Sequence, residues 1–373
     1  MKMKRRSFLK AVSVSAIAAQ AAGCASTEMR DDLKRVPIIS KPDGGGNPRI
    51  RGPFPILSTP FEESGAVSFK TLAGEARFVK KCGCKDMIWP QSGDSCDLLS
   101  VDEKLAGMEA IARELENSEA TVAFGCQGRG FEDARTCAEF VEKLASKYKI
   151  NAAIISRPPD DGKTEADLEK YYLGLEKIVS RPIIIQTGGG VMYKGPAPSV
   201  DLLLKLARHN PKVFGYIKEE SGDSNSRMAR ELAAKPLIHT VFSAWGSYQW
   251  LYQSRRIGSE GVITERPAYA DLLAKIWELM ENGDPRGELD TAFAKYLLML
   301  NISQFVPDDL RGGHLYVLRK RGVFKNLISR EYEKKDGKLS IPNAPIVRDL
   351  KLTQEQIDEI ETRFASLAPY LRV

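Results

Sequence analysis

The 373-residue sequence predicts an α/β fold: a (β/α)8 TIM barrel that is followed by a C-terminal helical extension. Short apolar runs alternate with amphipathic stretches, and eight such pairs fall between residues 51 and 284. Eight strand–helix pairs are typical of a closed barrel, which commonly contains about 250 residues. An open, doubly wound sheet is the alternative, but no GxGxxG sequence follows the first apolar run.

The eight apolar runs are the predicted strands. Each is apolar enough to be buried on both faces, as in a parallel sheet that helices cover. They span residues 54–57, 86–89, 121–124, 152–155, 182–185, 213–217, 239–242 and 261–263. The stretches between them predict helices over residues 69–81, 103–116, 131–148, 165–179, 199–208, 227–234, 247–255 and 268–282.

The last part of the chain, residues 285–373, extends beyond what a barrel requires. Amphipathic stretches predict an appended helical region, with helices around residues 287–303, 310–321 and 353–367. Thr353 is the predicted N-cap of the last helix, because Gln356 follows it at the spacing of a capping box.

Residues 1–24 have the organisation of an export signal. A basic stretch containing Arg5 and Arg6 precedes an apolar run that is too short to span a membrane. The paired arginines predict a twin-arginine signal, with a Sec-type signal as the alternative. Small residues then end at Cys24, as in a lipobox, so we expect an exported protein that is periplasmic or tethered to a membrane through acylated Cys24. Residues 25–50 are polar and predict a flexible tether.

Composition argues against several other classes of protein. The net charge is +6 at pH 7, but no cluster of Lys and Arg is interleaved with aromatic residues, so nucleic-acid binding is not expected. The three histidines lie far apart without HxH or HxxH spacing, which predicts surface or packed residues and no metal site. Besides Cys24, five cysteines without a CxxC pair suit buried free thiols better than a disulfide framework. No cofactor is predicted.

Lys218 is the first candidate catalytic residue. It ends the sixth predicted strand, and catalytic groups of TIM barrels lie at the C-terminal ends of strands. A lysine that points into a barrel mouth is partly desolvated, which favours the free amine. A free amine can attack a ketone and form an imine, an electron sink for making or breaking C–C bonds. The alternative is a lysine that is neutralised by Glu219 or Glu220.

Other loops at the same rim are candidates for substrate binding. Residues 89–95 follow the second strand and contain hydroxyls and a glycine, whose free N–H groups could hold a carboxylate; an ordinary polar loop is the alternative. Small-residue segments follow the seventh strand, at 242–246, and lead into the eighth, at 258–263. The predicted substrate-binding residues are Gln91, Ser92, Gly93, Asp94, Gln186, Thr187, Ser243 and Ile263.

Several of these segments follow the motifs of one known enzyme family. Residues 52–61 end in Thr-Pro-Phe like its first strand, and residues 93–95 stand where it has Gly-Glu-Ser. Residues 215–223 are similar to its segment with the imine-forming lysine. The chain, from about residue 52 to the last helix, thus resembles the dihydrodipicolinate synthase/N-acetylneuraminate lyase family of class I aldolases. The resemblance implies a barrel with an imine lysine at Lys218.

The sequence also departs from that family. Where the family has a catalytic tyrosine in a Pro-Tyr-Tyr context, residues 155–159 read Ile-Ser-Arg-Pro-Pro. Gln186 and Thr187 replace a Tyr-Asn pair, and the arginine of the synthases is not evident beyond them. Lysine biosynthesis is therefore not expected. Tyr216 lies two residues before Lys218 and should share its face, so it is predicted as a catalytic proton relay. The alternative is that Tyr216 fills the barrel interior.

Together these observations predict an exported Schiff-base aldolase or lyase. It would act on a 2-keto acid or a sugar-acid derivative through an imine at Lys218, and we expect it to form a homo-oligomer. The second hypothesis is a binding protein for a small carboxylate ligand that kept the pocket and lost turnover. A structural lipoprotein is disfavoured by the specific residues at the rim.

Overall fold

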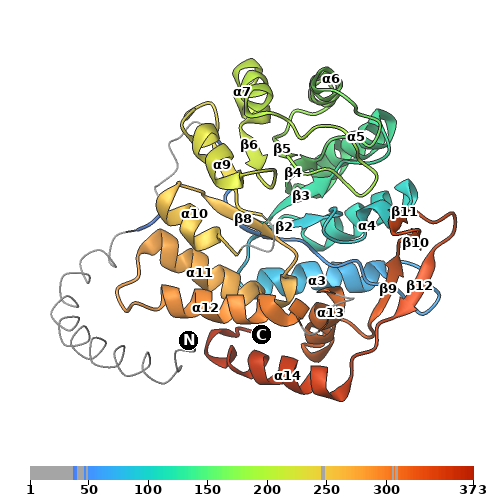
Figure 1. The fold of residues 1–373 in the computed structure, drawn as a ribbon, viewed down its shortest axis with the longest axis vertical. Coiled ribbons are helices and arrows are strands. Elements are labelled where there is room, and N and C mark those ends of the chain that lie inside the picture. The colour runs from blue at the N-terminus through green and yellow to red at the C-terminus, as the bar shows by residue number, and fades with distance from the viewer. Residues whose placement is uncertain (1–36, 40–45, 48, 245–247, 305, 307–309) are drawn as a thin grey trace, which may run out of the picture.

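A computed structural model of the protein describes residues 37–39, 46–47, 49–244, 248–304, 306 and 310–373 (Figure 1). The predicted signal segment, with Arg5, Arg6 and Cys24, lies outside the described residues. No described helix is long and apolar enough to cross a bilayer.

Eight parallel strands form the centre of the molecule, as predicted. They are β1 (Gly52–Pro55), β2 (Asp86–Trp89), β3 (Thr121–Gly125), β4 (Asn151–Ser156), β5 (Ile183–Gln186), β6 (Tyr216–Lys218), β7 (Thr240–Phe242) and β8 (Gly261–Thr264). Strands β2 to β7 pair in chain order, and β1 pairs with β8. Single bridges from Ile56 to Ile88 and from Ser243 to Val262 join these two sheets. The strands therefore close into the predicted barrel.

Helices cover the outside of the barrel (Figure 1). They are α3 (Phe69–Lys81), α4 (Val101–Glu114), α5 (Phe131–Tyr148), α6 (Glu165–Glu176), α7 (Val200–His209), α8 (Pro211–Phe214), α9 (Ser224–Leu232), α10 (Trp250–Arg256) and α11 (Ala270–Asn282). Short 3-10 turns are η3 (Cys96–Leu98) and η5 (Pro267–Tyr269). The sixth strand begins later than predicted, because Pro211 starts the one-turn helix α8 through residue 214.

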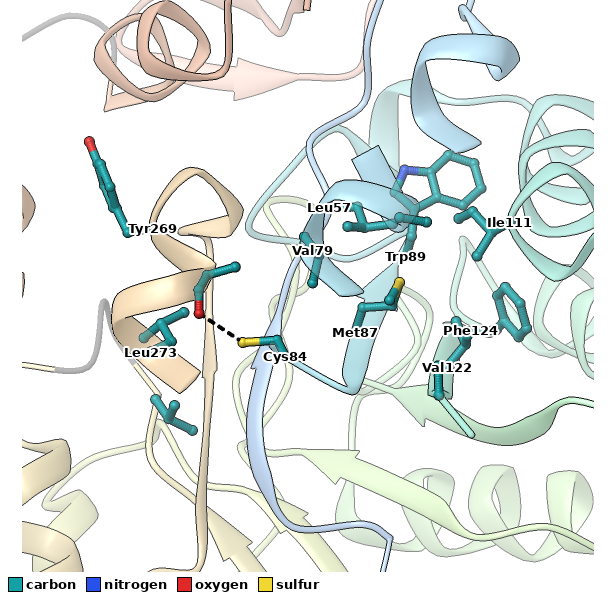
Figure 2. Close-up of a cluster of buried hydrophobic side chains, with 14 of the residues drawn as sticks. Leu57, Val79, Cys84, Met87, Trp89, Ile111, Val122, Phe124, Tyr269 and Leu273 are labelled. Atoms are coloured by element: carbon teal, nitrogen blue, oxygen red, sulfur yellow. Dashed lines mark hydrogen bonds between the residues drawn. The ribbon is translucent and has the colours of Figure 1, made fainter. Parts of the chain in front are cut away.

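Two apolar cores lie on the two faces of the strands. The outer core packs strands against helices, and Figure 2 shows Trp89 of β2 between side chains that include Val79 of α3 and Ile111 of α4. Cys84 donates from Sγ to a backbone carbonyl of α11 at 3.1 Å. The inner core fills the barrel with Ile50, Phe54, Ile56, Ile88, Ala123, Ala153, Ile155, Ile184, Tyr216, Phe242 and Ile263. The five described cysteines are buried and free, as expected.

Part of the predicted tether packs against the barrel. Ile50 closes the N-terminal end of the inner core, and its carbonyl accepts a hydrogen bond from Thr240 Oγ1 at 2.9 Å. The N–H of Asn47 donates to the Tyr216 hydroxyl at 2.6 Å. Ile39 is buried against the outer core. The described residues of this segment therefore contact the barrel, and the tether over 25–50 as a whole stays a prediction.

The C-terminal region combines helices with strands. The predicted helices are present as α12 (Leu289–Leu300), with the 3-10 turn η6 (Asn301–Gln304), α13 (Leu310–Lys320) and α14 (Gln354–Ala365), followed by η7 (Ala368–Tyr370). Thr353 caps α14 in the predicted capping box with Gln356. Four strands were not predicted: β9 (Ile328–Glu331), β10 (Glu333–Lys335), β11 (Lys338–Ser340) and β12 (Ile346–Asp349), paired as two antiparallel ladders. The region is not purely helical.

The position of this region matters for the site. Helix α12 packs against α11, and α13 packs against η5, the turn that follows β8. In Figure 1 the C-terminal region, in orange and red, covers one side of the barrel. Residues of α13 thereby come close to the C-terminal ends of the barrel strands.

Candidate active site

A cavity of about 690 Å³ lies at the C-terminal ends of the barrel strands. Five predicted site residues line it: Ser92, Gly93, Asp94, Gln186 and Lys218. Segments after β1, β2, β5, β6, β7 and β8 contribute, and α13 supplies His314 and Leu315. Such a volume falls in the range of sites for small organic ligands, about 300–1,000 Å³.

Lys218 and Glu220 form a buried ion pair in this cavity. Lys218 is the last residue of β6, in register with Gln186 of β5 and Phe242 of β7. It is 2% exposed, and its Nζ lies 2.9 Å from Glu220 Oε2. Both side chains line the cavity. The amine predicted as nucleophile is therefore placed at the ligand space, with a carboxylate in direct contact.

Glu219, the neighbouring acid, is held away from Lys218. Its Oε1 accepts hydrogen bonds from Thr187 Oγ1 at 2.8 Å and from the N–H of Ser221 at 2.7 Å. Its Oε2 accepts from Arg227 Nε at 2.9 Å. Thr187 does not line the cavity, and substrate binding by this residue stays a prediction. Its hydroxyl instead fixes the chain after Lys218, because it also accepts from the N–H of Glu220 at 2.9 Å.

The loop after β2 is ordered by its own side chains. Gln91 Oε1 accepts from the N–H of Gly93 at 2.6 Å, and the Gln91 carbonyl accepts from the N–H of Asp94 at 3.0 Å. The N–H groups of Gly93 and Asp94 are thus used within the loop. Ser92 lines the cavity, and its buried Oγ has no hydrogen-bond partner among the described residues. Its hydroxyl is the group of this loop that remains for a ligand.

Asp94 and Gln186 line the cavity, but their polar atoms are engaged. The Asp94 carboxylate accepts from the N–H of Thr59 at 3.0 Å and from the Thr59 hydroxyl, so it fixes the end of the first strand segment. Gln186 accepts from Gln91 Nε2 and donates to the Gly188 carbonyl at 3.1 Å. Gln91 itself is fully buried and does not line the cavity. These groups shape the site more than they offer contacts to a ligand.

Three further predicted residues lie outside the cavity lining. Tyr216 is 1% exposed, and its hydroxyl is hydrogen-bonded to Asn47 at the N-terminal end of the barrel. Ile263 belongs to the inner core, and Ser243 pairs with Val262 of the outer core. The structure does not bring the phenol to the cavity, because its hydroxyl lies at the opposite end of the barrel, and a catalytic role for Tyr216 stays a prediction.

The segment that replaces the family tyrosine is directed away from the cavity. Ser156 donates to the carbonyl of Cys126 at 2.8 Å and lies 2.8 Å from the Tyr171 hydroxyl. Arg157 is buried between Asp97 and Asp160, at 2.9 and 2.6 Å. Neither Ser156 nor Arg157 lines the cavity. Among the described residues, Glu220 is the carboxylate that forms an ion pair with Lys218.

Sequence reasoning missed the groups on the β8 side of the site. Glu265 and Arg266 follow β8, and His314 comes from α13. Glu265 and Arg266 lie two and three residues after the last predicted barrel strand, 261–263, so their position could have identified them. His314 carried no such signal, because only tertiary packing brings α13 to the rim. Among the residues that the structure describes, no group of three or more His, Cys, Asp and Glu is arranged to hold a metal ion.

Comparisons with known proteins agree with this geometry. No family model matches the chain. It is 22% identical over 208 residues to the 4-hydroxy-tetrahydrodipicolinate synthase of Bacillus subtilis, which covers 56% of this chain and 68% of that enzyme. The enzyme of the same name from Haloarcula marismortui is 23% identical over 176 residues, 47% of this chain and 54% of that one.

Solved structures extend the likeness to most of the chain. A sialic acid aldolase from Ruminococcus gnavus has a TM-score of 0.67 at 18% identity, covering 86% of this chain and 98% of that one. A dihydrodipicolinate synthase from Rhodopseudomonas palustris has a TM-score of 0.60 at 16% identity, covering 86% and 98%. The chain is therefore similar in sequence to 4-hydroxy-tetrahydrodipicolinate synthases and shares the fold of solved dihydrodipicolinate synthase and sialic acid aldolase structures.

Proposed function

We propose that the protein is a lyase of the class I aldolase type, which cleaves or forms a C–C bond of a 2-keto acid through an imine at Lys218. The observation that carries this proposal is the buried Lys218–Glu220 pair at the C-terminal end of β6, inside a cavity of about 690 Å³. The relationship to synthases and aldolases of the same fold supports it.

Lys218 and Glu220 can together carry out the proton transfers of imine formation. Glu220 takes a proton from the Lys218 ammonium, and the free amine attacks the C2 carbonyl of the keto acid. The carbinolamine then loses water, as Glu220 returns the proton to the departing hydroxyl. The protonated imine remains, and the carboxylate is regenerated.

The same carboxylate can serve the C–C bond step. In the cleavage direction, Glu220 removes the proton of the hydroxyl on C4, the C3–C4 bond breaks, and its electron pair moves into the imine to give an enamine. The products are an aldehyde and, after Glu220 protonates the enamine carbon and water releases the imine, a shorter keto acid. Glu220 would thus supply the proton transfers for which the sequence lacks the family tyrosine.

Ser92 is the residue that we assign to the substrate carboxylate. It lines the same cavity as Lys218, and its buried hydroxyl has no hydrogen-bond partner among the described residues. A hydroxyl can donate to a carboxylate, and an unpaired buried donor gains most from a ligand that satisfies it. The ligand class is therefore a small carboxylate.

A binding protein for such a carboxylate is the second candidate. It is favoured by the same ion pair, because a lysine that keeps its proton next to Glu220 binds anions and does not attack a ketone. A measurement of substrate turnover distinguishes the lyase from the binding protein.

The test is a panel of hydroxylated keto acids and sugar acids, assayed for pyruvate or aldehyde release. We expect the wild-type protein to cleave a member of the panel, and Lys218→Arg to lower the rate to background, since a guanidinium stays protonated. Lys205→Arg, on the exposed face of α7, is the matched control. Release of product by Lys218→Arg at the wild-type rate would refute the imine, and ligand binding without turnover would favour the binding protein.

A further inference from the structure

Arg266 is a buried cation without a carboxylate partner among the described residues. It lines the cavity that contains Lys218 and is 6% exposed. Among the described residues, its one hydrogen bond runs from Nη1 to the backbone carbonyl of Glu265 at 2.8 Å, and its Nε has no partner. Buried arginines are ordinarily paired, because an uncompensated charge away from water is costly. An anionic ligand would compensate it.

The acid next in sequence does not fill this role. The Glu265 side chain is turned toward the loop after β2, since a Cβ placed on Gly93 would lie 2.4 Å from Glu265 Oε1. No ion pair joins Arg266 to an acid in the described part of the chain. Glu220 is already paired with Lys218 at 2.9 Å, so it does not serve as the partner of Arg266.

His314 adds a second polar group on the same wall. It comes from α13, lines the cavity and is 5% exposed. Its Nδ1 has no hydrogen-bond partner among the described residues, and its ring packs edge-on against Tyr269 at 5.6 Å. Figure 2 shows Tyr269 with its hydroxyl directed away from the apolar side chains of the cluster. Burial and the charge of Arg266 hold the pKa of His314 well below its usual value, so its imidazole is neutral and carries one N–H donor.

We propose that Arg266 and His314 form a second anion subsite, which binds a carboxylate at the far end of the substrate. The inference rests on the proposed function and deepens it: the substrate is a keto acid with a second carboxylate. One carboxylate lies near Ser92 and Lys218, and the other pairs with the Arg266 guanidinium, which matches a carboxylate with two parallel hydrogen bonds.

A carboxylate fits this subsite better than a phosphate. The described lining residues include two cations, Lys218, which is paired with Glu220, and Arg266, and the acids Glu265 and Asp94 line the same cavity. A group with a single negative charge is balanced by one guanidinium, whereas a phosphate dianion would leave a charge uncompensated beside two acids. The cavity volume of about 690 Å³ also leaves room beyond a three-carbon keto acid.

The first experiment measures binding without any ketone. Adipate and hexanoate have six carbons each and differ in one terminal carboxylate, so calorimetry with both isolates that group. We expect adipate to bind the wild-type protein more tightly, and Arg266→Gln to weaken adipate by about 10-fold to 100-fold while hexanoate changes little. Arg266→Lys should recover part of the loss, and His314→Phe, which keeps a ring against Tyr269, should weaken adipate by a smaller factor.

The matched control is Arg129→Gln. Arg129 is exposed on the turn before α5, and its removal changes the net charge by the same amount. Equal affinity of the wild-type protein for the two acids would overturn the subsite. So would an equal loss for both acids in Arg266→Gln, or the same loss in Arg129→Gln.

The second experiment separates this proposal from the imine. 2-Oxoadipate and 2-oxohexanoate are incubated with the protein and reduced with borohydride, and the adduct is quantified by mass. We expect the concentration of 2-oxoadipate that gives half-maximal adduct formation to rise in Arg266→Gln. The corresponding concentration of 2-oxohexanoate should not change. Equal trapping of both acids, unaffected by Arg266→Gln, would refute the subsite and keep the imine. Binding of adipate that depends on Arg266, with no trapping of either keto acid, would keep the subsite and refute the imine.

Discussion

At the scale of single residues, the chemistry depends on two side chains that are two positions apart. Lys218 ends β6, and Glu220 lies in the turn that follows, so the backbone brings the carboxylate back toward the amine. Thr187 and Glu219 hold that turn in place through hydrogen bonds of 2.8 to 2.9 Å. The contact between amine and carboxylate is therefore held by the scaffold and does not depend on a flexible loop.

Replacement of Glu220 tests its role in proton transfer. Glu220→Gln keeps the size of the side chain and removes its basicity, so we expect kcat to fall by about 10²-fold to 10⁴-fold, the usual contribution of a general acid–base group. Steady-state kinetics on a cleaved substrate measure this, and Glu220→Asp should recover part of the rate. Wild-type kcat in Glu220→Gln would assign the proton transfers to water or another group.

Replacement of Tyr216, in contrast to that of Glu220, should have little effect on the reaction. Because its hydroxyl accepts from Asn47 at the N-terminal end of the barrel, Tyr216→Phe should leave imine trapping nearly unchanged. The lost hydrogen bond should lower the free energy of unfolding by about 1 kcal/mol. Denaturant unfolding and trapping are measured on the same sample. A large loss of trapping with unchanged stability would restore Tyr216 as a proton relay.

At the scale of elements, the sequence predicted those segments whose pattern is set by burial. The barrel strands and their helices were predicted because buried faces impose apolar runs and amphipathic periods. Strands β10, β11 and β12 were missed because their side chains are almost all exposed, so no apolar alternation marks them. The β6 boundary was missed because residues 213 and 214 are apolar whether they form a strand or the turn α8.

Helix α9 contains an acid whose protonation should affect stability. Glu231 is fully buried, and burial together with the nearby Glu219 carboxylate raises its pKa to about 9. Between about pH 5 and pH 9 the folded protein thus holds a proton that the unfolded chain has released. The free energy of unfolding should therefore fall as pH rises through this window.

Glu231→Gln should remove that dependence. The variant keeps the shape of the protonated acid, so we expect its melting temperature to fall less than that of the wild type between pH 6 and about pH 9. Glu139→Gln, at an exposed position of α5, is the control and should follow the wild type. Parallel curves for Glu231→Gln and the wild type would show that Glu231 is ionised in the folded protein.

At the scale of the whole molecule, the site is shared between the barrel and the C-terminal region. Lys218, Ser92 and Asp94 were predicted at the rim because strand ends of a barrel meet there, and all three line the cavity. The sequence could not place His314, since the packing of α13 on η5 is a long-range contact without a local pattern. Thr187 and Ser243 also follow strand ends, but neither lines the cavity, and the Thr187 hydroxyl is hydrogen-bonded to Glu219.

Export remains a proposal that rests on Arg5, Arg6 and Cys24. Changing both arginines to lysine preserves charge but should block a twin-arginine route, so we expect precursor to accumulate in the cytoplasm. Cell fractionation with immunoblotting measures it, and Cys24→Ser should release the exported protein from membranes. Normal export of the double-lysine variant would exclude the twin-arginine route.

The central claim is an imine at Lys218, and its most direct measurement is the mass of the reduced adduct. The protein is incubated with 2-keto acids, reduced with borohydride, digested and mapped by tandem mass spectrometry. We predict a single keto-acid adduct on the peptide that contains Lys218, and none in Lys218→Arg. An adduct that persists in Lys218→Arg, or that maps to another lysine in the wild-type protein, would contradict the account.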